Sequence, residues 1–142
     1  MKNKVFLCFD HGSKRIGVAV GQSITATATP LETINCTNGK PDWKAISRLI
    51  GQWQPGDLVV GKPLTMEGDR QEATEAAERF GRQLHGRYAL PVHFADERLS
   101  SHEARHRLKD SYNIDPHAAQ IILESWLRDQ VGEKSDVTMR NQ

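Results

Sequence analysis

An unbroken apolar run near the start of the chain, Val5 to Phe9, leads into Asp10-His11-Gly12. Such a run is typical of a strand buried in a core, and a glycine two positions after the acid favours a turn. Asp10 should therefore stand where a central strand leaves the core. In α/β proteins this end of a strand is a common place for functional side chains. What the chain can do then depends on which other side chains reach the same edge.

The rest of the chain alternates between strand and helix patterns. Short connections between the first three apolar runs predict an antiparallel meander, and the later strand–helix–strand units predict parallel pairing. The expected elements are strands at 5–9, 16–21, 26–34, 57–61 and 91–95, helices at 43–53 and 73–86, a short helix from Ser100, and a last helix opening at Asp115-Pro116. This order predicts an α/β fold with a mixed five-stranded sheet, three antiparallel strands followed by two parallel ones, and helices on both faces.

The length of 142 residues suits one domain, expected over 1–131, followed by a polar and flexible tail over 132–142. The net charge is only +1, so no strong global field for polyanions is expected. No apolar run approaches the ~20 residues that a membrane span needs, and no signal-peptide pattern is present. The cysteines, Cys8 and Cys36, lack metal-ligand spacing. A reducing, cytoplasmic location is the simplest interpretation.

Acids fall at the ends of three elements that the topology could bring together: Asp10, the pair Asp96-Glu97, and Asp115. Carboxylates that converge repel one another unless a cation neutralises them. Mg2+ prefers such oxygen ligands, and metal ions held this way can drive phosphodiester hydrolysis.

Each acid also has a simpler explanation. Asp10 could cap the turn at Gly12, and Glu97 could pair with a surface arginine. Asp115 directly precedes Pro116, and an aspartate there is what a helix start requires anyway. These roles do not exclude metal binding, because one carboxylate oxygen can cap while the other binds an ion.

Four motifs in order resemble the YqgF/RuvX family. They are Asp10 to Gly21 (DHGSKRIGVAVG), Val60 to Leu64 (VGKPL) with Met66-Glu67-Gly68, Asp96 to Ser100 (DERLS), and Asp115 to Ala119 (DPHAA) with Ile122 to Ser125 (ILES). The resemblance runs from about Phe6 to Leu127. It implies an RNase H-like fold and a bacterial nuclease of precursor 16S rRNA, in a family also described as Holliday junction resolvases because its fold resembles RuvC.

The resemblance also implies roles for individual residues. The presumed catalytic and metal-binding acids fall on Asp10, Glu97 and Asp115, which would hold one or two Mg2+ (or Mn2+) ions. Asp96 and Gly12 would support them. The residues that would contact nucleic acid are Lys14, Arg15, Lys62 and Arg98.

The chain departs from the family pattern in three places. One is mild: Thr65-Met66-Glu67-Gly68 stands where the family usually has Asn-Met-Asp-Gly. Lys62 replaces a leucine of the fourth-strand motif, and the loop before Asp115 is shorter and less basic than is common, which weakens the case for binding through it. Lys62 could partly compensate.

Several functions stay open at this point. The leading hypothesis is metal-dependent processing of the 5′ end of precursor 16S rRNA, with ribosomal particles as further partners and no membrane. One alternative is a resolvase acting on branched DNA, which should be a two-fold dimer, whereas the sequence leaves monomer and homodimer open. Another is a non-catalytic RNA-binding factor of ribosome assembly. An actin-like ATPase is disfavoured because such enzymes enclose nucleotide between two domains of this kind.

Overall fold

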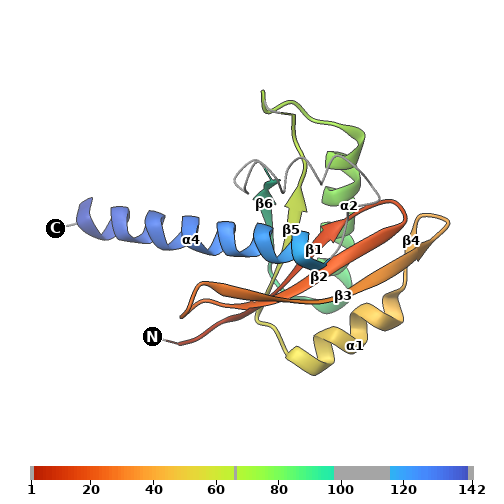
Figure 1. The fold of residues 1–142 in the computed structure, drawn as a ribbon, viewed down its shortest axis with the longest axis horizontal. Helices are drawn as coiled ribbons and strands as arrows, with labels where there is room; N and C mark the ends of the chain where they lie inside the picture. The colour runs from red at the N-terminus through yellow and green to blue at the C-terminus, as the bar shows by residue number, and fades with distance from the viewer. Residues whose placement is uncertain (1, 66, 98–115, 141–142) are drawn as a thin grey trace.

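The computed structural model describes residues 2–65, 67–97 and 116–140, the last ten of these as backbone alone. Within these ranges a six-stranded sheet has the order β4-β3-β2-β1-β5-β6 (Figure 1). The strands are β1 (Val5–His11), β2 (Arg15–Gln22), β3 (Thr27–Thr37), β4 (Lys40–Pro41), β5 (Asp57–Lys62) and β6 (Val92–Asp96), and the helices are α1 (Trp43–Trp53), α2 (Glu72–Tyr88) and α4 (Pro116–Arg140).

Strand pairing follows the expected pattern. β1, β2 and β3 are antiparallel neighbours, whereas β1 with β5 and β5 with β6 are parallel. The α/β fold class and the mixed sheet are therefore confirmed. The short strand β4 is an addition to the expected five. It forms because Asn38 and Gly39 both take positive φ, 53° and 75°, which gives a tight hairpin turn from β3 into β4.

Helices cover the two faces of the sheet with separate cores. On β1, Leu7 and Phe9 pack toward α1 and α2, whereas Phe6 and Cys8 pack toward α4. Side chains alternate between faces along a strand. Asp10 therefore belongs to the face that α4 covers.

Contacts from α4 fix its position over that face. The ring of Trp126 lies 5.5 Å from Phe6 and 5.1 Å from His93. Gln120 Nε2 donates to the carbonyl of Ala28, and Glu124 accepts from the N–H of Ala28, both at 3.0 Å. These bonds satisfy backbone groups of β3 that would otherwise lie at an edge.

The last helix begins at Pro116, as the sequence predicts, and runs to Arg140, so that its end extends beyond the sheet (Figure 1). A domain boundary near residue 132 stays a prediction. The short helix expected from Ser100 lies outside the described residues. Across the described part of the chain, no helix combines the length and apolar composition that crossing a membrane would take.

Candidate active site

Asp10 occupies a buried position near the end of β1. Its Cα pairs with that of Gly17 on β2, and its side chain is only 1% exposed. A carboxylate in such a place loses most of its hydration, which is costly unless nearby groups compensate. This burial distinguishes Asp10 from an acid that merely caps a solvent-exposed turn.

Glu97 follows directly after β6 and is 7% exposed. Its carboxyl group is hydrogen-bonded to that of Asp10. Because β5 lies between β1 and β6, Glu97 must reach across β5 to make this contact. The structure thus brings together two of the three acids predicted to be catalytic.

Gly61 on β5 provides the space for this reach. A Cβ atom at Gly61 would lie 2.7 Å from Oε1 of Glu97 and 3.2 Å from Cδ1 of Ile122 on α4. Real Cβ atoms do not approach other atoms as closely as the first of these distances. The sequence predicts that Gly61 lies at the edge of the site. It does not predict that the side chain of Glu97 packs over Gly61. A glycine ending the apolar run of β5 was the available signal, since glycine in a strand often marks close approach of another group.

The contact with Asp10 changes the acidity of Glu97. Burial is the main cause that raises the pKa of Glu97 well above its usual range, and the charge of Asp10, their hydrogen bond and the charge of Asp96 add to it. The two buried carboxyl groups therefore favour a state in which they share one proton in the hydrogen bond between them. The predicted support residue Asp96 lies close enough to act on Glu97 by its charge.

The donor set fits a hard divalent cation. Two buried carboxyl groups in contact cannot both ionise easily, and a cation between them would remove this conflict. Among the described residues no group of three His, Cys, Asp or Glu side chains is placed to hold a metal ion. Asp115, the third predicted ligand, lies outside the described residues.

The turn after β1 carries two of the predicted nucleic-acid contacts. Lys14 is exposed and Arg15 is half-buried at the start of β2. The N–H of Gly12 donates to the carbonyl of Arg15 at 3.0 Å, which closes the turn. Gly12 thus closes the turn that follows Asp10, and its supporting role in the site stays a prediction. Arg98, the remaining predicted arginine, lies outside the described residues.

Lys62 is held by an acid that the sequence did not associate with it. Nζ of Lys62 lies 3.3 Å from Glu78 on α2, and Glu78 also pairs with Arg70. The hydrogen bond from Arg70, with help from Lys62, lowers the pKa of Glu78 to about 2. Glu78 therefore stays ionised at neutral pH, and Lys62 has an intramolecular partner that a phosphate would have to replace.

Replacing Glu78 with glutamine should release Lys62 and Arg70 for phosphate contacts. We expect affinity for single-stranded RNA to rise about threefold at low salt, with a steeper dependence on salt because each added phosphate contact releases counterions. Fluorescence anisotropy across a salt series measures both. Glu72→Gln removes a charge from the exposed first turn of the same helix and is the matched control. Equal affinities of the two variants would contradict this role of Glu78.

His11 lies on the opposite face from the acids, with its ring 4.9 Å from that of Phe80. Burial, and secondarily the charge of Arg79, lowers the pKa of His11 from 6.5 to about 4. The unfolded chain therefore binds a proton between these values while the folded chain does not. Stability from the neutral His11 is complete above pH 6.5 and declines as the pH falls toward 4.

This difference is measurable by urea unfolding of the wild type and His11→Gln at pH 7.5 and pH 5. Relative to the variant, the wild type should lose about 2 kcal/mol between these conditions. The comparison must be made against the variant because Glu97 also changes the stability with pH. Its raised pKa makes both proteins more stable as the pH falls, which is opposite to the effect of His11. Parallel pH dependences of the two proteins would show that His11 titrates normally.

Comparisons with known proteins place the chain in a family. Residues 4–129 match the model of the RuvX family, described as Holliday junction resolvase. The chain belongs to the RuvX family. A relative from Hydrogenovibrio crunogenus, named "Putative pre-16S rRNA nuclease", is 52% identical over 87% of this chain and 92% of its own length. A RuvX relative of the same name from Nitrosococcus oceani is 51% identical over 91% of this chain and 90% of its own length.

Solved structures support the fold of this RuvX protein. Thermus thermophilus RuvC in complex with a Holliday junction substrate matches with a TM-score of 0.55 at 13% identity, over 91% of this chain and 96% of that one. A second Thermus thermophilus RuvC structure matches with a TM-score of 0.52 at 15% identity, over 90% and 96% of the two chains. The expected RNase H-like fold is confirmed.

Proposed function

We propose that this RuvX protein is a metal-dependent nuclease that processes the 5′ end of precursor 16S rRNA. The observation that carries the proposal is the contact of Asp10 with Glu97 across Gly61. Two buried acids held together at one edge of the sheet lower the stability of the fold, so stability does not explain their placement. They suit a site for hydrolysis of a phosphodiester. The names of the relatives supply the substrate.

Asp10, Glu97 and Asp115 would hold one or two Mg2+ or Mn2+ ions. When bound, such ions activate water and offset charge on a scissile phosphate. Glu97 would give up its proton as a cation binds, because the cation favours its ionised form. Lys14, Arg15 and Arg98 would hold the sugar–phosphate backbone, and Asp96 would support Glu97. A cytoplasmic location and contact with ribosomal particles follow from this substrate.

A branched DNA junction is the second candidate substrate, favoured by the description of the family. The deciding experiment incubates the wild type with a precursor 16S rRNA fragment and with a four-way DNA junction, each in Mg2+ and in EDTA. Mg2+-dependent cleavage of the RNA alone is the expected result. Cleavage of the junction alone would overturn the RNA assignment. Cleavage of neither would overturn the nuclease assignment in favour of a non-catalytic assembly factor.

A further inference from the structure

Three polar side chains form an exposed row along β3: Thr33, Asn35 and Thr37, here called the β3 strip. The residue between the first two, Ile34, is buried in the core beneath α1 and α2, and Cys36 packs against the same core. Since side chains alternate along a strand, the β3 strip lies on the other face of the sheet. That is the face on which Asp10 lies.

Strand register connects the β3 strip to Asp10. Thr33 pairs with Gly17, which in turn pairs with Asp10, so that the three form one row across the sheet. Two strand spacings separate the ends of this row, about 10 Å. Gly17 contributes no side chain between them. In the next row Asn35 pairs with Arg15, one of the cations predicted to contact nucleic acid.

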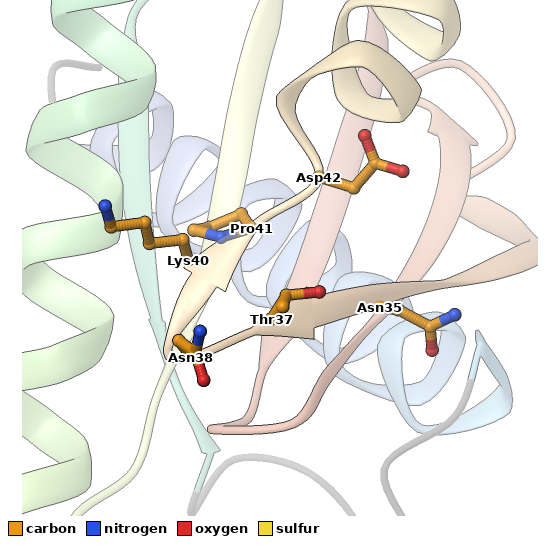
Figure 2. A pocket seen from close by; sticks show the side chains of 6 residues that line it. All are labelled: Asn35, Thr37, Asn38, Lys40, Pro41 and Asp42. Atoms are coloured by element: carbon orange, nitrogen blue, oxygen red, sulfur yellow. The ribbon is translucent and has the colours of Figure 1, made fainter.

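A hollow extends the β3 strip at the β3–β4 hairpin. Its lining residues are Asn35, Thr37, Asn38, Lys40, Pro41 and Asp42. Figure 2 shows the polar groups of Asn35, Thr37 and Asp42 turned to the same side of the hairpin, while Lys40 extends to the other. On that side the hollow offers the amide of Asn35 and the hydroxyl of Thr37 to a ligand.

Charges around the β3 strip favour a polyanion. Lys14 is exposed in the turn before β2, and Arg15, which pairs with Asn35, is half-buried beside the strip. The acid beside them, Asp42, accepts a hydrogen bond from the N–H of Ala45 at 3.3 Å and so caps α1. Two basic side chains therefore lie beside the strip, together with one acid that already has a structural role. The acids at the far end of the row, Asp10 and Glu97, are those that would hold a cation.

The side chains of the β3 strip suit a ribose–phosphate backbone. Threonine hydroxyls and the asparagine amide each donate and accept hydrogen bonds. They recur about every 7 Å along the strand, which is comparable with the spacing of consecutive phosphates in an extended strand. The 2′-hydroxyl of ribose likewise donates and accepts, and it is the group by which proteins distinguish RNA from DNA.

We propose that the β3 strip binds a single-stranded stretch of RNA adjoining the bond that is cleaved, and leads it toward Asp10. The inference rests on the proposed function, because it takes the ligand to be the substrate of that site. It assigns the strip to backbone contacts rather than to base stacking, since its members are aliphatic and polar. It predicts stronger binding of RNA than of DNA of the same sequence.

Binding in EDTA tests the proposal without cleavage. Anisotropy of a labelled single-stranded RNA is measured for the wild type, for T33E combined with T37E, and for T29E. Thr29 is an exposed residue of the same strand that pairs with Val20, a residue of the core beneath α1 and α2. The control therefore places one added negative charge on the opposite face, against two in the double variant. The double variant should bind about tenfold more weakly, and T29E should bind like the wild type.

A second double variant, T33A with T37A, removes the hydroxyls without adding charge. It keeps the test valid if the glutamate double variant fails to fold. In the alanine double variant the ratio of the affinity for RNA to the affinity for DNA of the same sequence should be smaller than in the wild type. Unchanged binding by both double variants, or equal wild-type binding of RNA and DNA, would overturn the proposal. Failure of the proposed function is distinct: it would show as no cleavage by the wild type, whatever the β3 strip binds.

Discussion

Replacing Asp10 with asparagine should reduce Mg2+-dependent cleavage of precursor 16S rRNA by about 100-fold or more. Asparagine has nearly the same shape but no charge, so the site would lose a carboxylate that attracts a cation. Asp10 is 1% exposed, which leaves little room for a water or another side chain to replace it. The measurement is the rate of product formation under single-turnover conditions.

The loss in Asp10→Asn should not come from unfolding. Removing the charge of Asp10 also removes a cause that raises the pKa of Glu97, so the variant should unfold at the same temperature as the wild type or higher. Asp69→Asn, which changes an exposed aspartate in the loop before α2, is the control and should cleave normally. Cleavage by Asp10→Asn at the wild-type rate would show that Asp10 is not a catalytic residue and that it serves only the turn after β1.

The pairing of Asp10 with Glu97 could be foreseen from topology. Both acids follow apolar strands that the strand–helix–strand pattern predicts to be parallel, and parallel strands end at the same edge of a sheet. The sequence could not show that Glu97 reaches across β5, because this depends on the direction of one side chain. Gly61 is visible in the sequence, but its purpose is visible only beside Glu97.

Lys62 is a residue whose partner could not be predicted from the sequence. Its position next to the predicted site suggested contact with nucleic acid, yet its partner in the structure is Glu78, which is far away in sequence. Such pairs between separate elements depend on how a helix is rotated on the sheet, which the apolar pattern fixes only approximately. The hairpin into β4 is a local feature, and its Asn38-Gly39 signal could have been interpreted as a turn between strands.

Replacing Gly61 with alanine should impair cleavage while leaving the fold intact. The new methyl group would meet Oε1 of Glu97 at 2.7 Å. Because this atom is the far end of a flexible side chain, Glu97 can rotate away at modest cost to stability, whereas the contact with Ile122 at 3.2 Å needs only a slight shift. Glu97 would then lose its contact with Asp10, and we expect cleavage to fall about 10- to 100-fold.

The position of Glu97 in Gly61→Ala can be tested independently of activity. Away from Asp10, Glu97 would lose the charge and hydrogen-bond contributions of Asp10, so its pKa should fall, which NMR titration of the glutamate side chain would detect. Gly51→Ala is the control, because a Cβ atom there meets nothing within 4 Å and alanine favours the α1 helix in which it lies. A Gly61→Ala enzyme that cleaves like the wild type with Glu97 displaced would mean that the reaction does not need Glu97 beside Asp10. The same rate with the pKa of Glu97 still raised would mean instead that the site can accommodate the methyl group, and that Gly61 does not position Glu97.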